Sequence, residues 1–411
     1  MILVAAALSA APSAFAQQAP SNPFSSGGQT TPPNGPETTV EVSAQAQYNS
    51  NIAGSDEQIA AQRGLKLADE IFTPGLDFTL ARQVGRPLLY LRGDVNYAYY
   101  AVNTFRSRTD FNLDGGASGH FGPCQEDVTG AYAHNETPLS ELALGVIHNI
   151  EETASVGFDA RCGRQSGLTP TVSVQENWLN NTSKIQSVID NQTTSVDAGI
   201  GYTRPTVGTL SLFGDYSSAT YPNRRFLVMG VSAPDILIYG YNVYGGGIRF
   251  ERPVGGRISI LASLSYTSLE GNSPGAVGFH GITYSADATY NVSTHLSTHV
   301  QAVRATQPSN RPGSNFSLRT TYEADTTYQL GSRYTIVLSA QYQNLNYPGS
   351  NPRITLDLTD ETTYSGMITI NYKLTRRIRL GLTTSEENRS ANFPGLSFDA
   401  TKVTLHAVAT F

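Results

Sequence analysis

The sequence predicts an all-β fold, an up-and-down antiparallel β-barrel of about 18 strands that crosses an outer membrane, with about 16 strands as the alternative. Three observations support this prediction. Tyr, Thr, Val, Gly and Ser are frequent, whereas Lys, Glu and Met are scarce, and this balance favours strands over helices. Apolar and polar residues alternate along most of the chain, and turn sequences recur at a near-regular spacing.

Composition excludes several other classes of protein. The chain has 411 residues, of which 39% are hydrophobic and 15% are charged. This share is below the roughly 45–50% that is usual in a soluble globular domain. The chain also contains no run of about 18 consecutive apolar residues that could form a transmembrane helix. The net charge of -6 is spread over the chain, and no cluster of basic residues stands out, so we expect no nucleic-acid partner.

The first residues predict export. Residues 1–16 read MILVAAALSAAPSAFA, an apolar run that ends in the small-x-small pattern Ala14-Phe15-Ala16 of a signal-peptide cleavage site. One departure is that no Lys or Arg precedes the apolar run, and a buried helix is the alternative interpretation. Residues 17–38 are rich in Pro, Gly, Ser and Gln without periodicity, so we expect a flexible periplasmic tail that is able to dock a periplasmic partner.

Residues 39–411 are predicted to form the barrel. In the last stretch of the chain, alternate residues from Val403 to Phe411 are apolar, whereas Lys402, Thr404 and His406 fall on the other face. The same division between an apolar and a polar face recurs in residues 258–267, 318–328 and 363–373. This period of two is typical of a strand with one face toward lipid and the other toward a polar interior.

Short and long connections alternate along the chain. The predicted short turns are 84–86, 124–127, 162–167, 205–208, 253–257, 292–295, 330–333 and 374–377. Longer polar segments lie between them, at 51–70, 180–193, 221–240, 270–281, 307–315, 347–361 and 386–400. Short turns that join pairs of strands in this way give an even number of strands, with both termini on the short-turn side.

A sheet with an apolar outer face can lie in lipid only if every backbone group is paired, so it must close on itself. Tyrosines near the strand ends are expected to form interfacial girdles, and they are Tyr97, Tyr99, Tyr202, Tyr216, Tyr244, Tyr290, Tyr334 and Tyr342. The alternative is a soluble β-sandwich or a secreted solenoid. The terminal aromatic Phe411 weighs against both, because an alternating last strand that ends in an aromatic resembles the signal recognised by the outer-membrane barrel-assembly machinery.

Several segments resemble the putative β-barrel porin 2 family of Gram-negative, especially alphaproteobacterial, outer membranes. The segments that carry the resemblance are Ala160-Arg161-Cys162-Gly163, Leu168-Thr169-Pro170, Gly201-Tyr202-Thr203-Arg204-Pro205, Leu210-Ser211-Leu212-Phe213-Gly214 and Tyr221-Pro222-Asn223-Arg224. They are turn and strand sequences, so they indicate an architecture and carry no catalytic signature. The resemblance implies an outer-membrane pore, and it implies an association of some members with exopolysaccharide synthesis and export.

The two cysteines, Cys124 and Cys162, are predicted to lie in successive short turns on one rim of the barrel. A disulfide between them is the favoured interpretation in an oxidising periplasm, with two free thiols as the alternative. Closing a loop of this size would contribute roughly 4 kcal/mol in the chain-entropy model. The spacing is not Cys-x-x-Cys and no His accompanies it, so we expect no redox or metal role.

Other motifs favour structural interpretations. His295 and His299 have an H-x-x-x-H spacing, but on an extended chain they would lie about 13 Å apart, too far for one metal ion. The run 245–247 of three glycines lies within an alternating strand and is expected to ease curvature or aromatic packing. No histidine has a nearby Ser or acidic partner at the spacing of a known catalytic motif. We therefore expect no metal, no cofactor and no enzymatic activity.

Charged residues on the polar face are the candidate functional residues. They come from many strands, and as opposed rows in a porin they would set a transverse field that orders polar solutes. The candidates are Arg92, Asp94, Asp159, Arg161, Asp197, Arg249, Glu251, Asp287, Arg319, Glu323, Asp325, Arg377 and Arg379, together with the neutral Asn96. Both signs of charge are present, so the sequence leaves open whether anions or cations are preferred.

The predicted function is passage of hydrophilic solutes through an outer-membrane barrel, with a role beside exopolysaccharide export as the leading specific version. A general nutrient porin is the next interpretation. A plugged barrel that acts as an adhesion or binding scaffold and an outer-membrane hydrolase are the alternatives from other classes. The expected partners are outer-membrane lipid, the barrel-assembly machinery, and polar solutes or polysaccharide; association into oligomers is left open.

Overall fold

The structure is a computed structural model. It describes residues 32–33, 35–139, 148–163, 166–227, 236–254, 257–272, 277–309, 314, 316–348 and 358–411. The predicted signal peptide, residues 1–16, and most of the predicted tail, residues 17–38, lie outside the described residues. The first strand begins at Glu37, two residues before the predicted start of the barrel.

The protein forms one 18-stranded sheet, as predicted. Its first nine strands are β1 (Glu37–Asn49), β2 (Asp69–Gln83), β3 (Leu88–Tyr100), β4 (Arg108–Phe121), β5 (Cys124–Glu136), β6 (Ile150–Cys162), β7 (Gly167–Asn181), β8 (Asn191–Arg204) and β9 (Gly208–Leu227). The other nine are β10 (Ile236–Val254), β11 (Ile258–Gly271), β12 (Phe279–Asn291), β13 (Leu296–Pro308), β14 (Phe316–Leu330), β15 (Tyr334–Asn346), β16 (Asp360–Lys373), β17 (Ile378–Ala391) and β18 (Phe398–Thr410).

Each strand pairs antiparallel with the next, and the pairing of β1 with β18 closes the barrel. In this closing pair Glu41 lies opposite Thr410, and Asn49 lies opposite Lys402. The backbone N–H of Phe411 also donates to the carbonyl of Val40 at 2.8 Å. Closure pairs the backbone groups that a free edge would leave exposed to lipid.

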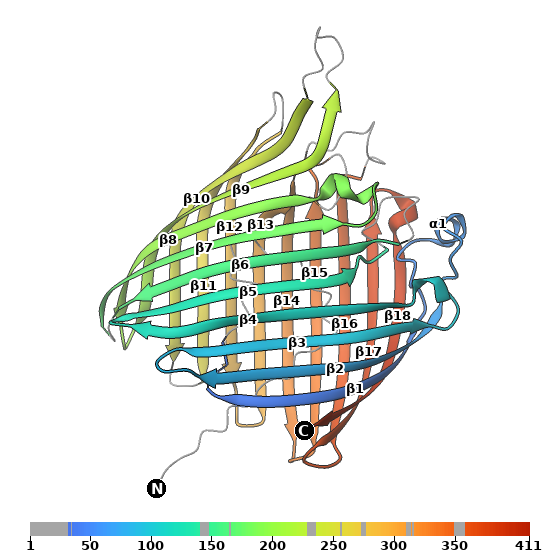
Figure 1. The fold of residues 1–411 in the computed structure, drawn as a ribbon, viewed down its shortest axis with the longest axis horizontal. Helices are drawn as coiled ribbons and strands as arrows, with labels where there is room; N and C mark the ends of the chain where they lie inside the picture. Colours follow the sequence, from blue (N-terminus) through green and yellow to red (C-terminus); the bar gives the residue numbers. More distant parts are fainter. Residues whose placement is uncertain are drawn as a thin grey trace.

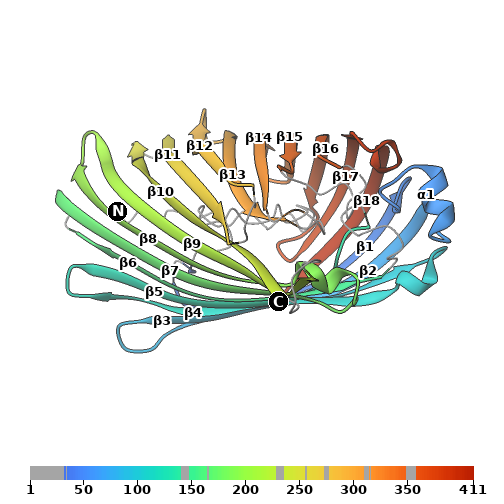
Figure 2. The ribbon, with the colours of Figure 1, turned by 90° about the horizontal axis from the view of Figure 1, so that it is seen from above.

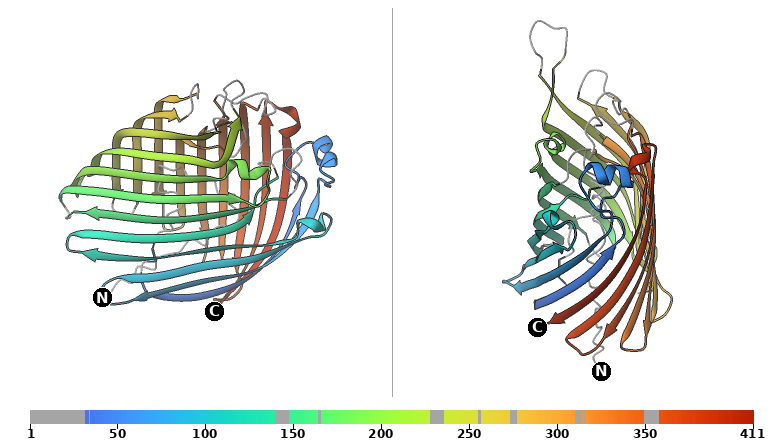
Figure 3. Two further views of the ribbon diagram at one scale, coloured as in Figure 1. Left: turned by 45° about the horizontal axis from the view of Figure 1, so that its top comes forward. Right: turned by 90° about the vertical axis from the view of Figure 1, so that its right-hand side faces the viewer.

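The barrel is flattened rather than round. In Figure 1 the strands β1 to β8 cross the front, whereas β11 to β18 run upright behind them, so the two walls have clearly different strand directions. The view from above in Figure 2 shows an elongated outline, and the right-hand view in Figure 3 shows the narrow side. Strands β9 and β10 form the bend at which the front wall passes into the back wall (Figure 1).

Glycines lie at this bend, as the run 245–247 predicted. A Cβ at position 247 would overlap the backbone carbonyl of Leu264 on β11, and one at position 245 would overlap the carboxylate of Asp215 on β9. The sheet can therefore approach itself closely at β9 to β11 only because these positions lack a side chain.

All the short connections lie at one end of the barrel, called here the short-turn end, and all the long ones lie at the other, the long-loop end. The first residue of β1 and the last of β18 are at the short-turn end, as predicted. Several boundaries differ from the prediction, and two of them are substantial. Residues 124–127 were expected in a turn but begin β5, because the turn is made by Gly122 at φ 61 and Pro123. Within the predicted loop 221–240, β9 continues to Leu227 and β10 begins at Ile236.

Short helices lie in the long connections. They are α1 (Glu57–Gln62), η1 (Thr104–Arg106), η2 (Gln186–Ile189) and η3 (Pro394–Leu396). Helix α1 begins where the carboxylate of Asp56 accepts the N–H of Ile59 at 2.8 Å, and it is seen at the long-loop end in Figure 1. None of the helices among the described residues has the length and apolar character needed to cross a membrane.

Buried polar clusters hold the long-loop end together. Glu136, whose side chain is fully buried, pairs with Arg106 at 2.8 Å and with Arg108 at 2.5 Å. On the far wall, the carboxylate of Glu361 accepts from Tyr347 at 2.9 Å and from Arg389. These contacts satisfy charged groups that would otherwise be buried without partners.

Asp190, which follows η2, anchors another of the long connections. Its carboxylate accepts from the backbone and the side chain of Asn181, at 2.7 and 2.9 Å, and from Asn223 at 2.7 Å. Burial raises the pKa of Asp190, and these hydrogen bonds oppose that rise. The connection between β7 and β8 is thereby tied to β9.

Candidate functional site

The inner wall of the barrel is the candidate functional site, and strand alternation decides which residues face it. In β3 the side chains of Leu91, Val95 and Tyr97 are exposed on the outer surface, whereas the intervening Arg92 and Asp94 are half-buried on the inner face. In β18 the outward residues include Val403 and Leu405, as the sequence predicted. The outer surface is therefore apolar, and the inner wall is polar.

The tyrosines predicted to lie at the membrane interface point outward. All of them except Tyr342 are exposed, and Tyr97, Tyr202 and Tyr290 are examples. Tyr342 is half-buried because its ring packs between those of Tyr322, at 5.9 Å, and Tyr364, at 5.1 Å. Such amphipathic rings suit the boundary between lipid and water.

Among the strand residues that the structure describes, carboxylates outnumber cations on the inner wall. Those that strand alternation places inward are Glu37, Glu41, Asp69, Asp77, Asp94, Asp110, Asp114, Asp127, Glu151, Asp159, Asp197, Asp215, Glu251, Asp287, Glu323, Asp325, Glu361 and Glu387. The inward cations by the same criterion are Arg92, Arg108, Arg161, Arg249, Arg319, Lys373, Arg379, Arg389 and Lys402. The described part of the inner wall therefore carries a net negative charge.

On the front wall the sheet register places acidic side chains directly opposite one another. Glu41 on β1 lies opposite Asp77 on β2, which in turn lies opposite Asp94 on β3. The Asp94 carboxylate accepts from Asn112 at 3.0 Å and from Asn96 at 2.9 Å. Like charges on directly opposed residues are destabilising, so this row concentrates negative potential on the wall.

A second acidic row continues toward the bend. Asp127 on β5 lies opposite Asp159 on β6, and Asp197 on β8 lies opposite Asp215 on β9. The guanidinium of Arg249 pairs with both carboxylate oxygens of Asp197, at 3.0 and 3.3 Å, and so compensates one member of the second pair. Its position is fixed further by the ring of Phe213, whose centroid lies 4.5 Å away.

An ion pair crosses the inside of the bend. Arg161 on β6 donates to the carboxylate of Glu251 on β10 at 2.8 Å, although β7, β8 and β9 lie between these strands in the sheet. The inner surfaces of β6 and β10 therefore face each other across a narrow part of the interior. Both side chains remain partly exposed, at 45% and 39%, so the pair is in contact with solvent.

The closing strands carry a further ion pair. Arg379 on β17 donates to both oxygens of Glu41 on β1, at 2.9 and 3.1 Å, across the intervening β18. Thr410 on β18 donates to the same carboxylate at 2.7 Å. This group ties together the first and the last two strands of the barrel on its inner face.

The back wall has a cluster around one histidine. The ring of His299 on β13 lies 2.6 Å from Asp287 on β12 and 3.4 Å from Asp325 on β14, measured from Nε2 and Nδ1 respectively. Ser339 donates to Asp325, and Gln341 donates to Glu323 at 3.5 Å. The cluster is half-buried and belongs to the polar wall.

The structure places nearly all of the predicted wall residues on the inner face. Arg377 is the exception: it is exposed in the turn between β16 and β17, because β17 begins only at Ile378. Arg319 faces inward but is buried at the long-loop end. The sequence prediction omitted Glu41, Asp77 and Asp215, although the alternation in β1, β2 and β9 contained the signal.

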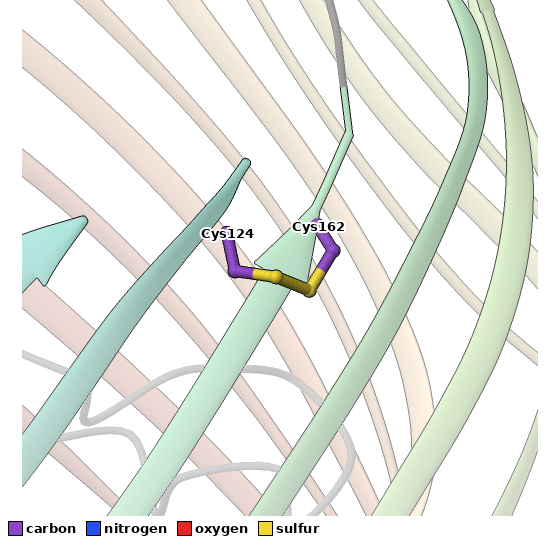
Figure 4. The surroundings of a disulfide bond; sticks show 2 residues. All are labelled: Cys124 and Cys162. Atoms are coloured by element: carbon purple, nitrogen blue, oxygen red, sulfur yellow. A yellow bond between two sulfur atoms is a disulfide. The ribbon is translucent and has the colours of Figure 1, made fainter. Parts of the chain in front are cut away.

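Cys124 and Cys162 form a disulfide, as predicted (Figure 4). They are directly opposed residues at the ends of β5 and β6, with a Cα separation of 3.8 Å. The bridge closes a segment of 38 residues at the short-turn end. It therefore fixes the register of this pair of strands.

The described residues hold little that resembles catalytic or metal chemistry. Ser268 lies 3.0 Å from the Nδ1 atom of His280 on the outer surface, and no described carboxylate or amide makes a hydrogen bond to that ring. A Ser-His-acid arrangement at the outer rim, which a hydrolase would need, is thus not formed by these two residues. No group of three or more potential metal ligands occurs among the described residues.

A comparison with solved structures finds similarity to several outer-membrane proteins. They include the siderophore receptor PirA of Pseudomonas aeruginosa, at 10% identity and a TM-score of 0.43, covering 93% of this chain and 81% of that one. OpdK of the same species has 9% identity and a TM-score of 0.46 over 91% of this chain and 99% of that one. OccK2 (OpdF) has 10% identity and a TM-score of 0.47 over 92% and 99%. No curated protein matches the chain in sequence.

Residues 246–411, which extend from the bend in β10 to the carboxyl terminus, match the family described as putative beta-barrel porin 2. This match confirms the resemblance found in the sequence, and it is to a family of porins and not of enzymes. The protein is therefore an outer-membrane β-barrel of 18 antiparallel strands whose residues 246–411 match the family described as putative beta-barrel porin 2.

Proposed function

We propose that the protein is an outer-membrane pore that passes small hydrophilic solutes and prefers cations. The observation that carries the proposal is the division between an apolar outer surface and a polar inner wall in a closed sheet. A polar lining lowers the cost of removing a solute from water, so passage needs no bond-making residue. A barrel of this strand number is wide enough for a passage, as porins of about 16–18 strands are.

The orientation follows from the connections. The first residue of β1 and the last residue of β18 lie at the short-turn end, and outer-membrane barrels have short turns on the periplasmic side and longer loops outside. The short-turn end is therefore assigned to the periplasm. In this orientation the buried clusters around Glu136 and Glu361 lie at the extracellular end of the barrel and stabilise it.

The preference for cations rests on the charge of the inner wall. Arg249, Arg379 and Lys402 are each paired with a carboxylate, namely Asp197, Glu41 and Glu387. Acidic side chains still outnumber basic ones on the described part of this wall, so we expect the passage to attract mobile cations and repel anions. The sequence alone left this sign open, because it does not show which charges compensate each other.

A role beside exopolysaccharide export stays a prediction that rests on the family resemblance. An acidic wall favours a neutral or cationic polymer over an acidic one, since like charges repel along the whole passage. The general nutrient porin is the second candidate, and the same lining supports it. The predicted tail partner, the recognition of Phe411 by the assembly machinery and the oligomeric state also stay predictions.

Planar-bilayer recording of the refolded mature chain, residues 17–411, tests the proposal. Steady steps proportional to salt concentration are expected, and a KCl gradient should give a reversal potential of the sign produced by cation flux. A correctly folded, heat-modifiable barrel that conducts no current would contradict the pore and favour a plugged scaffold. A reversal potential of the opposite sign would overturn the cation preference alone.

A further inference from the structure

The short-turn end of the barrel carries a ring of exposed cations, which we call the basic ring. Its members are the exposed Arg82, Arg86, Arg204, Arg257, Arg333, Lys373, Arg376 and Arg377, and the half-buried Arg252. No ion pair joins any of them to a carboxylate among the residues that the structure describes. The positive charge of the ring is therefore available to a partner.

The ring extends around the barrel. Its members belong to the hairpins β2–β3, β8–β9, β10–β11, β14–β15 and β16–β17, which are distributed over both walls of the closed sheet, whereas the described residues of the three hairpins between them supply no member. The turns 84–87, 205–207, 292–295, 331–333 and 374–377 contain no acidic residue. A docked protein covers one sector of such a ring, whereas a membrane leaflet surrounds all of it.

Strand alternation directs part of the ring toward the membrane. Arg82, Arg204 and Arg252 each lie two residues beyond an outward-facing apolar residue of the same strand, and these apolar residues are Leu80, Tyr202 and Phe250. They share the lipid-facing side of the sheet and sit where its apolar band ends. They do not line the passage, so they do not offset the acidic inner wall.

We infer that the basic ring binds the phosphate groups of anionic phospholipids in the leaflet that surrounds the short-turn end. A guanidinium donates in a planar fork that matches a phosphate, and long basic side chains reach from the edge of an apolar band to the headgroups. The inference rests on the membrane location of the barrel that the proposed function requires. It does not depend on whether the lumen conducts.

The test is lipid selectivity of the refolded full chain in phosphatidylcholine vesicles that contain a minor fraction of phosphatidylglycerol. Spin-labelled lipids report the ratio of the two association constants at the protein surface. The wild-type ratio should favour phosphatidylglycerol and should fall toward unity at high salt. Each basic residue near the surface contributes up to about fivefold, so R82Q/R204Q should lower the ratio by at least about twofold.

K66Q/K184Q is the matched control, because both lysines are exposed but lie in long-loop connections. Its lipid ratio should stay close to that of the wild type. Equal ratios for the two lipids in the wild type would overturn the inference, as would an equal loss in the control. Displacement of phosphatidylglycerol by inorganic phosphate at constant ionic strength would assign the ring to free phosphate and would also overturn it.

Conductance separates this inference from the proposed function. R82Q/R204Q should conduct like the wild type, since neither side chain faces the passage. A conducting wild type without lipid selectivity would leave the pore standing and remove the inference. A barrel that prefers phosphatidylglycerol but conducts no current would support the inference and contradict the proposed pore.

Discussion

Asp197 on β8 and Asp215 on β9 lie directly opposite each other on the inner wall, and the structure gives Arg249 an ion pair with Asp197. Asp215 makes no ion pair among the described residues, and its carboxylate lies against the backbone of Gly245. A pair of opposed carboxylates with a single guanidinium retains one net negative charge. The same pattern in Glu41 and Asp77, where Arg379 pairs with Glu41, repeats this surplus near the closing strands.

Substitutions at the first pair should shift ion preference in opposite directions. Asp215→Asn should lower the ratio of cation to anion permeability, and Arg249→Gln should raise it by exposing Asp197. A unit charge contributes roughly 1 kcal/mol at about 4 Å in water, so each shift should be at most about fivefold. Reversal potentials in a KCl gradient measure both. Glu70→Gln is the control, because Glu70 is exposed on the outer surface, and its reversal potential should not move.

The Arg161–Glu251 pair should narrow the passage, because it joins β6 to β10 across the inside of the bend. Arg161→Ala should therefore raise single-channel conductance, and so should Glu251→Ala. Ion selectivity distinguishes an effect of pore width from an effect of wall charge. Arg161→Ala should become more selective for cations, and Glu251→Ala should become less so. If both variants keep the wild-type conductance, the bridge lies away from the narrowest part of the passage.

Gly247→Ala should destabilise the barrel, because the new Cβ would overlap the backbone carbonyl of Leu264. Overpacking of this kind costs about 1–3 kcal/mol. Gly366→Ala is the matched control, since no heavy atom lies within 4 Å of its Cβ position. Urea unfolding followed by the fluorescence of Trp178, the only tryptophan, compares the two. Equal stability of the two variants would show that the bend tolerates a side chain.

Loss of the disulfide should lower stability without opening the barrel. The double variant Cys124→Ser/Cys162→Ser should lose at most about 4 kcal/mol, since the bridge closes 38 residues and the two strands are paired in any case. Urea titration measures the change. A reductant should shift the wild type by the same amount and leave the double variant unchanged, and a reductant effect on the double variant would point to another cause.

Glu136→Gln should be strongly destabilising, because it leaves Arg106 and Arg108 without the carboxylate that pairs with both. Removing one partner of a buried ion pair costs about 3–5 kcal/mol. The control is Glu152→Gln, whose carboxylate is 39% exposed and lies beside His134, and there the loss should stay below about 1 kcal/mol. Similar urea midpoints for the two variants would show that the Glu136 cluster is solvated.

Much of the fold could be predicted from the sequence. The period of two assigned Leu91 and Arg92 to opposite faces, because adjacent side chains of a strand point to opposite sides whatever the rest of the chain does. The recurring turns gave the strand number and the end at which Glu37 and Phe411 lie. The misplaced turn at 124–127 is local: the polar residues after Cys124 suggested a loop, but Gly122 with its positive φ makes the turn earlier.

What the sequence by itself determined is therefore which residues form strands and which face each one presents. Only the tertiary structure decided which charges meet. Arg379 and Glu41 pair although 338 residues separate them, and Arg161 reaches Glu251 across three intervening strands. The physical reason is that alternation is a property of the local backbone, whereas register, closure and the bend depend on hydrogen bonds between strands far apart in the chain. The net charge of the passage follows from those pairings.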